Sequence, residues 1–245
     1  MASLYDRLGV GYTRVRREEP RIAARIHAAL GDARTVVNVG AGTGNYEPRD
    51  REVTAVEPSE LMIAQRPPDR APVVRATAEA LPFPDGRFDA AMAVLSDHHW
   101  PDRAGGLREM RRVARRRAVV FQFDLRALLE FWLVREYLTT FRPEGSTADG
   151  LERDLGVTRV ETVEIPHDCR DGFLSAYWRR PHAYLDPAVR AGISVFRLLP
   201  EADVAEAMVR LEADLASGEW ERRHGDLLGL DEIDLGYRLW IADYD

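Results

Sequence analysis

Two adjacent histidines, His98 and His99, lie just past an apolar segment, residues 88–95, whose composition is that of a buried strand. An acid, Asp97, precedes the pair and a tryptophan follows it. Because the pKa of imidazole lies near neutral pH, a histidine in this position can accept the proton of a reacting O–H, N–H or acidic C–H group. The alternative is that one histidine only caps or packs against the helix expected next. We treat both as candidate general bases.

A glycine-rich loop, residues 40–44 (GAGTG), follows another apolar segment, residues 35–39. Backbone without a Cβ atom can approach a ligand closely, so Gly40 and Gly42 are candidate binding positions. The spacing is G-x-G-x-G, whereas dinucleotide binders have G-x-G-x-x-G, so the ligand need not contain a pyrophosphate. The next apolar segment ends at Glu57, whose carboxylate could bind both hydroxyls of a ribose or could be an exposed acid at a strand end.

Short apolar segments that read as strands alternate with helical segments through the first half of the chain. The expected strands are residues 35–39, 53–56, 73–76, 88–95 and 118–123, and the expected helices are residues 20–30, 59–65 and 101–115. This alternation predicts an α/β fold with a doubly wound, Rossmann-like, mostly parallel sheet and helices on both faces. Ligands of such sheets bind beyond the carboxyl ends of the strands, where the histidines, the glycine loop and Glu57 all lie.

The second half of the chain has a different pattern. We expect a helix over residues 125–141, a loop over 142–149, a strand over 160–165, a mostly helical stretch over 171–217 and a final strand over 235–241. The helical stretch would form a lid inserted before the last strand. Residues 1–245 are then a single domain with an N-terminal helical segment (1–34), a ligand-binding core (35–124) and a substrate-side half (125–245).

Several motifs along residues 1–124 resemble those of the class I S-adenosyl-L-methionine (AdoMet) dependent methyltransferases. They are a glycine-loop motif at 36–44, an acidic strand end at 53–59, the A-E-x-L-P-F and F-D signature at 78–83 and 85–89, and a helix end at 111–113. The signature is similar to that of the ubiquinone/menaquinone branch, the methyltransferase type 11 family. The resemblance implies that AdoMet is the cofactor and that residues 35–124 bind it.

On the methionyl and ribose side, the resemblance implies roles for residues at three strand ends. Gly40, Ala41 and Gly42 would pass beneath the methionyl part and the ribose of AdoMet. Glu57 would bind the ribose hydroxyls, and the carbonyl of Leu95 would lie near the methionyl amino group.

On the adenine side, Pro58 would flank the ring, and Ala78 and Glu79 would lie along its edge. Asn38 stands where the family usually has an acid, so this position keeps a hydrogen-bonding group but loses a charge that would attract the sulfonium. Thr77 likewise replaces an acid that often contacts the adenine amino group.

Tyr12 and Arg16 lie four residues apart, which places them on one face if the segment is helical. Related enzymes hold the methionyl carboxylate with a tyrosine and an arginine in this segment, and the planar guanidinium suits a carboxylate. The resemblance therefore implies that both bind the cofactor. Packing of Tyr12 and solvation of Arg16 are the alternatives.

The acceptor side carries no motif, and its candidates rest on residue type. Phe131, Tyr177 and Trp178 could form an apolar wall for an aromatic or isoprenoid acceptor, although aromatic residues at helical spacing are more often core. His167 and Asp168 follow the strand at 160–165 and could line the same pocket or form a turn. The histidines and the single cysteine lack the short spacing of a metal site, so no metal is expected.

All 34 basic residues are arginine, because the 245-residue sequence contains no lysine. This excludes a lysine Schiff base, a P-loop and a protein-kinase site, each of which needs a lysine. The net charge of −7 argues against nucleic-acid binding, and the arginine-rich stretch at 111–117 is the expected cationic end of a helix. One cysteine and the lack of an apolar leader or membrane-length segment predict a cytoplasmic protein with no membrane partner. We expect a monomer or a homodimer.

Together these features predict a methyltransferase that moves a methyl group from AdoMet to an O, N or C atom of a small molecule, with specialised metabolism as one setting. The alternative is an AdoMet-binding protein without catalysis that regulates or assembles with a partner. A dinucleotide-dependent oxidoreductase fits less well because the glycine spacing is wrong.

Overall fold

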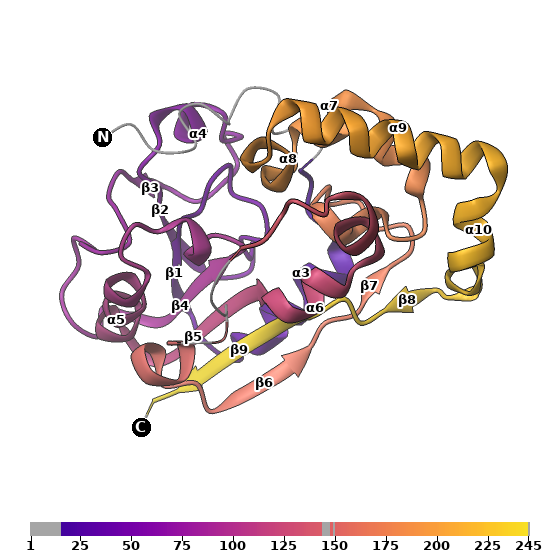
Figure 1. Cartoon of the computed structure of the whole chain (residues 1–245). Helices are drawn as coiled ribbons and strands as arrows, with labels where there is room; N and C mark the ends of the chain where they lie inside the picture. Colours follow the sequence, from indigo (N-terminus) through magenta and orange to yellow (C-terminus); the bar gives the residue numbers. More distant parts are fainter. Residues whose placement is uncertain (1–15, 144–147, 149, 245) are drawn as a thin grey trace.

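The computed structural model describes residues 16–143, 148 and 150–244, and its centre is a seven-stranded sheet with the order β3-β2-β1-β4-β5-β9-β6 (Figure 1). The strands are β1 (Thr35–Val39), β2 (Glu52–Val56), β3 (Val73–Val74), β4 (Phe88–Val94), β5 (Ala114–Phe123), β6 (Arg159–Thr162) and β9 (Tyr237–Asp243). The first five run parallel, and β9 is antiparallel to both of its neighbours, β5 and β6. The predicted α/β fold with a mostly parallel sheet is therefore confirmed.

Alternate residues of the central strands belong to two separate cores, one on each face of the sheet. In β4, Ala90 and Met92 lie in one core, whereas Ala91 and Ala93 lie in the other. Helices α3 (Pro20–Ala29) and α6 (Leu125–Glu130) contribute to the first core, and α5 (Arg103–Val113) contributes to the second. The central strands are mostly apolar on both faces because helices cover both.

Side-chain caps fix where the helices after β2 and β4 begin. The hydroxyl of Ser59 accepts a hydrogen bond from the N–H of Met62 at the start of α4 (Glu60–Ala64). The carboxylate of Asp102 accepts one from Gly105 at the start of α5, at 2.9 Å. Each cap satisfies an N–H group that has no partner within its helix. The caps therefore end the two loops that carry Glu57 and the histidine pair.

A helical lid lies between β6 and β9. It consists of two 3₁₀ turns (Leu174–Tyr177 and Pro181–Leu185) and of α7 (Pro187–Ala191), α8 (Ser194–Leu198), α9 (Glu201–Ser217) and α10 (Glu219–His224). Figure 1 shows α7, α8 and α9 along the top of the molecule and α10 descending from the end of α9. The predicted lid is present and extends beyond residue 217. Within the described ranges, no helix combines the length and the apolarity needed to cross a bilayer.

Two expected elements are interrupted. The helix expected over 125–141 ends at Glu130, because Phe131 is extended (ψ 129°), and the chain resumes as a π-helical turn at Leu133–Tyr137. The strand expected over 160–165 is divided, since β6 pairs with β9 while β7 (Ile165–Pro166) pairs with β8 (Glu232–Ile233). Phe131 and Trp132 are each 4% exposed, so the interruption in the helix accompanies the burial of two large aromatic rings.

Candidate functional site

Two cavities lie at the carboxyl ends of β1 and β4, where the strand order of the sheet reverses. The first, of about 360 Å³, is lined by the glycine loop, and we call it the loop-side cavity. The second, of about 470 Å³, is lined by residues of the lid, and we call it the lid-side cavity. Arg16, Leu95 and His99 line both, so the two cavities meet at these three residues.

The glycine loop approaches the residues after β4 closely because it lacks side chains at the points of contact. Gly40 has a φ of +70°, and a Cβ atom there would lie 2.7 Å from the Cβ of Ser96 and 3.2 Å from Nε1 of Trp100. Gly42 has a φ of +53°, and its Cβ would lie 3.3 Å from Cε of Met62. Both positions need glycine for their backbone conformation, and Gly40 also needs it for space.

The carboxylate of Glu57 is held at the wall of the loop-side cavity by two backbone N–H groups. Gly42 donates to Oε2 at 2.8 Å, and Ser59 donates to Oε1 at 2.9 Å. Glu57 is only 4% exposed, so these charge-assisted bonds offset part of the cost of burying a carboxylate. The residue therefore presents an oriented hydrogen-bond acceptor to this cavity.

Asn38 lies beside a buried acid from another segment. Its Nδ2 donates to Oε1 of Glu47 at 3.3 Å, and Arg66 donates to the same oxygen at 2.7 Å. Arg66 also donates to the carbonyl of Gly42 at 3.0 Å. The ion pair of Arg66 and Glu47 is therefore connected to the glycine loop by a hydrogen bond. An aspartate at position 38 would place two carboxylates in contact, whereas the amide donates a hydrogen bond to Glu47.

Arg16 is fixed at the junction of the cavities by a buried acid from the second half of the chain. Its Nε donates to Oδ1 of Asp171 at 2.6 Å, and its Nη2 donates to Oδ2 at 3.1 Å. Asp171 is fully buried and also accepts a hydrogen bond from the hydroxyl of Tyr46 at 2.8 Å. Burial and the neighbouring Asp171 raise the pKa of Tyr46, so its hydroxyl keeps its proton. The cluster joins the N-terminal segment, the glycine loop and the substrate-side half.

Leu95 adopts a strained backbone conformation at the same junction. Its φ of +50° lies in the left-handed region, which a branched side chain rarely occupies and which costs about 1–2 kcal/mol. The N–H of Leu95 donates to the carbonyl of Phe121 at 2.8 Å, so the neighbouring strand β5 helps to hold this conformation. Such strain is typical of residues that border a ligand.

Both histidines of the pair are neutral at pH 7. Burial, and then the positive charges of Arg103 and Arg16, lower the pKa of His98 to about 3. Burial and then His98 lower the pKa of His99 well below its ordinary value. The ring centroids lie 3.8 Å apart, and His98 lines the lid-side cavity while His99 lines both cavities. The pair therefore offers uncharged hydrogen-bonding groups to a ligand.

Acid is expected to destabilise the protein through His98. Because the unfolded chain takes up this proton near pH 6.5 and the folded protein only near pH 3, the free energy of unfolding should fall as the pH decreases through that interval. Urea unfolding at a series of pH values measures this loss. The His98→Gln variant should show a smaller slope of the free energy of unfolding against pH. His182→Gln, at an exposed histidine, is the matched control. Equal slopes for His98→Gln and the wild type would contradict this assignment.

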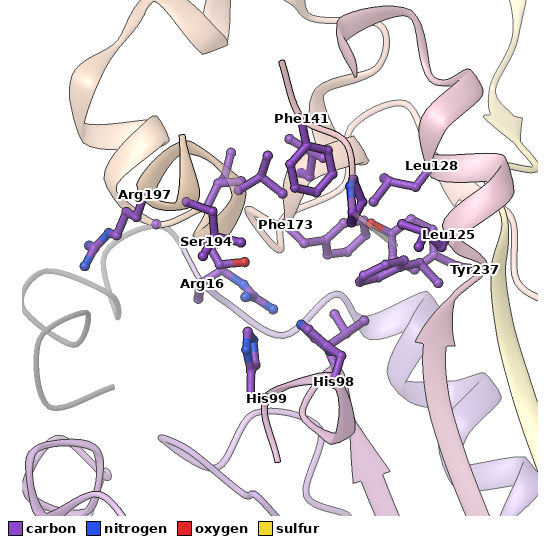
Figure 2. Close-up of a pocket in the computed structure, with 18 of the residues that line it drawn as sticks. Arg16, His98, His99, Leu125, Leu128, Phe141, Phe173, Ser194, Arg197 and Tyr237 are labelled. Atoms are coloured by element: carbon purple, nitrogen blue, oxygen red, sulfur yellow. The ribbon is translucent and has the colours of Figure 1, made fainter. Parts of the chain in front are cut away.

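The lid-side cavity has a mainly apolar wall and a polar side. Its apolar lining includes Leu125, Leu128, Phe141, Phe173, Val195 and Tyr237. Figure 2 shows Arg16, His98 and His99 together on one side of this space and the aromatic and aliphatic residues on the other. An apolar molecule with a polar group at one end fits such a lining.

Every predicted cofactor residue in the described part of the chain lines the loop-side cavity: Arg16, Asn38, Gly40, Ala41, Gly42, Glu57, Pro58, Ala78, Glu79 and Leu95. Tyr12 lies outside the described residues. The sequence-based list lacks Asn45, Ser96 and Trp100, which line the same cavity. Trp100 directly follows the histidine pair, and its position after a strand end is the signal that could have indicated it.

None of the residues predicted for the acceptor side is found along the lid-side cavity. Phe131 and Trp178 are buried in the core, and Tyr177 packs its ring against a guanidinium. His167 contacts a backbone carbonyl through Nδ1, and Asp168, 60% exposed, forms a surface ion pair. These five residues therefore do not line this cavity, because residue type alone does not separate a cavity wall from core or surface. That they contact an acceptor stays a prediction.

Known proteins resemble this chain in sequence. A family model described as a methyltransferase domain matches residues 37–121. The demethylmenaquinone methyltransferase of Mycolicibacterium gilvum is 32% identical over 157 residues, which are 61% of this chain and 69% of that protein. The 2-methyl-6-phytyl-1,4-hydroquinone methyltransferase of Synechocystis is 27% identical over 195 residues, which are 68% of this chain, and the chain spans 61% of that relative's length.

A solved structure extends the similarity through the lid. A protein from Anabaena variabilis, described as a methyltransferase from an antibiotic biosynthesis pathway, superposes with a TM-score of 0.80 at 33% identity. The match covers 93% of this chain and 98% of that one. Together with the sheet order, the glycine loop and Glu57, these similarities establish that the chain belongs to the class I AdoMet-dependent methyltransferases of the type 11 family, whose cofactor is AdoMet.

Proposed function

We propose that this protein transfers the methyl group of AdoMet to a quinone-like or hydroquinone-like small molecule that binds in the lid-side cavity. The meeting of two cavities at Arg16, Leu95 and His99 carries the proposal. A cofactor in one cavity and an acceptor in the other would bring their reacting atoms together at this junction. Both curated relatives act, by their names, on quinone-type molecules, and the apolar wall of the lid-side cavity suits such a ring.

The residues of the loop-side cavity fit AdoMet. Gly40 leaves the space that a Cβ atom would fill, Glu57 offers an oriented acceptor for ribose hydroxyls, and Arg16 offers a guanidinium for the methionyl carboxylate. When bound, AdoMet supplies an electrophilic methyl group, and the S–C bonding electrons stay on sulfur while an electron pair of the acceptor forms the new bond. The proton that the acceptor loses would pass to water or to His99, which lines both cavities.

The lid-side cavity would contribute by excluding water and by orientation. Its apolar side chains would surround the acceptor, which strengthens the electrostatic interactions that Arg16 and the histidines make at the junction. Methyl transfer needs an in-line approach of the reacting atoms to about 3–3.5 Å. The buried pair of Arg16 and Asp171 would help to keep the junction fixed for that approach.

Calorimetric titration tests the cofactor assignment. AdoMet and S-adenosylhomocysteine should bind, and binding of NADPH in their place would refute the proposal. Glu57→Gln should weaken AdoMet binding about 10- to 100-fold, because a hydrogen bond to a charged group contributes roughly 1.5–3 kcal/mol. Glu60→Gln is the matched control, because it alters a side chain on the neighbouring helix that is 73% exposed. This variant should bind AdoMet with the affinity of the wild type.

Turnover tests the acceptor class. Formation of S-adenosylhomocysteine is measured with a panel of quinones, hydroquinones and simple phenols. Methylation of a hydroquinone would support the proposal. AdoMet binding without turnover of any panel member would instead favour an AdoMet-binding protein without catalysis.

A further inference from the structure

A buried glutamine beneath the histidine pair has its amide orientation fixed by two hydrogen bonds. Gln122, on β5, is fully buried. Its Oε1 accepts from the backbone N–H of Phe123 at 2.8 Å, and its Nε2 donates to Oδ1 of Asp97 at 2.6 Å. If the amide were reversed, Oε1 of Gln122 would lie 2.6 Å from Oδ1 of Asp97, and its NH₂ group would face the backbone N–H of Phe123. Neither contact could be a hydrogen bond.

The fixed amide determines which nitrogen of His98 carries the proton. Nε2 of Gln122 lies 2.6 Å from Nδ1 of His98. Because an amide nitrogen only donates, Nδ1 of His98 must accept and is therefore unprotonated. A neutral ring with a bare Nδ1 has its proton on Nε2.

An ion pair between Arg103 and Asp97 holds the acceptor of the Gln122 amide in place. Nε and Nη2 of Arg103 each donate to Oδ2 of Asp97 at 2.8 Å, and Asp97 is fully buried. Oδ1 of the same carboxylate accepts one N–H of Gln122, which leaves the other for His98. Arg103, Asp97 and Gln122 form a chain of hydrogen bonds that ends at Nδ1 of His98.

The protonated nitrogen of His98 is the polar atom that the ring offers to a ligand. His98 is partly exposed and lines the lid-side cavity, and no other described residue forms a hydrogen bond with its Nε2. Figure 2 shows His98 extending toward the space between Arg16 and His99. The N–H donor of His98 and the guanidinium of Arg16 thus both line the lid-side cavity.

We propose that His98 is a fixed N–H donor to an oxygen of the methyl acceptor and is not the base that deprotonates it. The proposal rests on the proposed function and narrows its substrate class to acceptors that present an oxyanion, such as a phenolate or an enolate, at the junction. Donation from His98 would stabilise that oxyanion, whose proton has left to solvent. An oxygen held in this way is a weaker nucleophile, so the methylated atom would be a neighbour of that oxygen.

Nitrogen NMR of the full-length protein decides the tautomer without any acceptor or cofactor. In a long-range ¹H–¹⁵N spectrum of histidine-labelled protein, His98 should show a protonated Nε2 and a bare Nδ1 at pH 7, and the His98→Gln spectrum assigns its signals. A protonated Nδ1, or an imidazolium, would overturn the proposal. Because calorimetry with AdoMet is independent of this spectrum, failure of the proposal and failure of the proposed function are distinguishable.

Variants test the role in turnover. Glutamine at position 98 can place an amide N–H near the site of Nε2 but cannot act as a base, whereas asparagine places one near Nδ1. We expect His98→Leu and His98→Asn to lower kcat/KM about 10- to 100-fold and His98→Gln to retain at least about tenfold more activity than either. If His98 were the base, His98→Gln would be no better than His98→Leu, with a loss of about 10²–10⁴.

Gln122→Met tests the positioning role of the glutamine. It removes the amide that fixes the ring, so the spectrum of His98 should change from one tautomer to a mixture and kcat/KM should fall. Thermal unfolding of each variant checks that it is folded. An unchanged Nε2–H tautomer in Gln122→Met would show that Gln122 does not set the proton position and would contradict this part of the proposal.

Discussion

Replacing Asp171 with alanine is expected to lower the free energy of unfolding by about 3–5 kcal/mol. Asp171 is fully buried, and Arg16, whose side chain is 13% exposed, directs both Nε and Nη2 to it. Removal of the carboxylate leaves a largely buried guanidinium without this counter-charge and leaves the hydroxyl of Tyr46 without its acceptor. Urea unfolding followed by tryptophan fluorescence measures the change. AdoMet binding should weaken as well, because the orientation of Arg16 would be lost.

A second aspartate in the chain provides the matched control. Asp168 pairs with Arg21 at 2.7 Å, but the two side chains are 60% and 51% exposed. Asp168→Ala should therefore cost less than about 1 kcal/mol. A loss at Asp171 no larger than that at Asp168 would contradict the role assigned to the buried pair. The double variant Arg16→Leu, Asp171→Leu should recover part of the stability, because it leaves neither charge unpaired.

Gly40→Ala is expected to weaken AdoMet binding by at least about 100-fold, which corresponds to roughly 2.7 kcal/mol. The new Cβ would lie 2.7 Å from Cβ and 2.8 Å from Oγ of Ser96, at a φ of +70°. Ser96 cannot move without loss, since its hydroxyl donates to the carbonyl of Val39 at 3.0 Å. The glycine loop must therefore shift, and it forms a wall of the cavity that would hold the cofactor.

The control for Gly40 is a glycine with the same backbone conformation but with free space around it. Gly86 has a φ of +59°, and the nearest atom to a Cβ there is 3.8 Å away. Gly86→Ala should cost about 1–2 kcal/mol of stability through its φ alone and should bind AdoMet as the wild type does. Calorimetry on both variants compares them. Equal AdoMet affinity of Gly40→Ala and Gly86→Ala would show that the close approach to Ser96 is unimportant.

The lining of the loop-side cavity was predictable because its requirements are local. Gly40 and Gly42 directly follow β1, and Glu57 directly follows β2, so motif spacing and the ends of apolar segments were enough to find them. The parallel sheet then brings these strand ends to one edge without further information from the sequence. The same argument placed the histidine pair at the end of β4.

The partners that orient those residues were not predictable by spacing. Asp171 lies 155 positions from Arg16 in the chain, and only the folded lid half brings them together. Gln122 gave a signal that could have been used, since a glutamine within the apolar run 118–123 must be buried and must find partners. The lining of the lid-side cavity was missed for a different reason: Phe131 and Phe173 are both buried in the core, yet only Phe173 also lines this cavity.

The position of β9 has a consequence for the order in which the site forms. β9 lies between β5 and β6 in the sheet, although residues 163–236 separate it from β6 in the chain. Pairing across such a sequence separation is slow, because the loop-closure entropy must be lost before the contacts form. Strands β1 to β5 can pair during synthesis before β9 has left the ribosome, whereas Tyr237 on β9 lines the lid-side cavity. The loop-side cavity would form first, and the lid-side cavity would be completed when β9 pairs with the sheet.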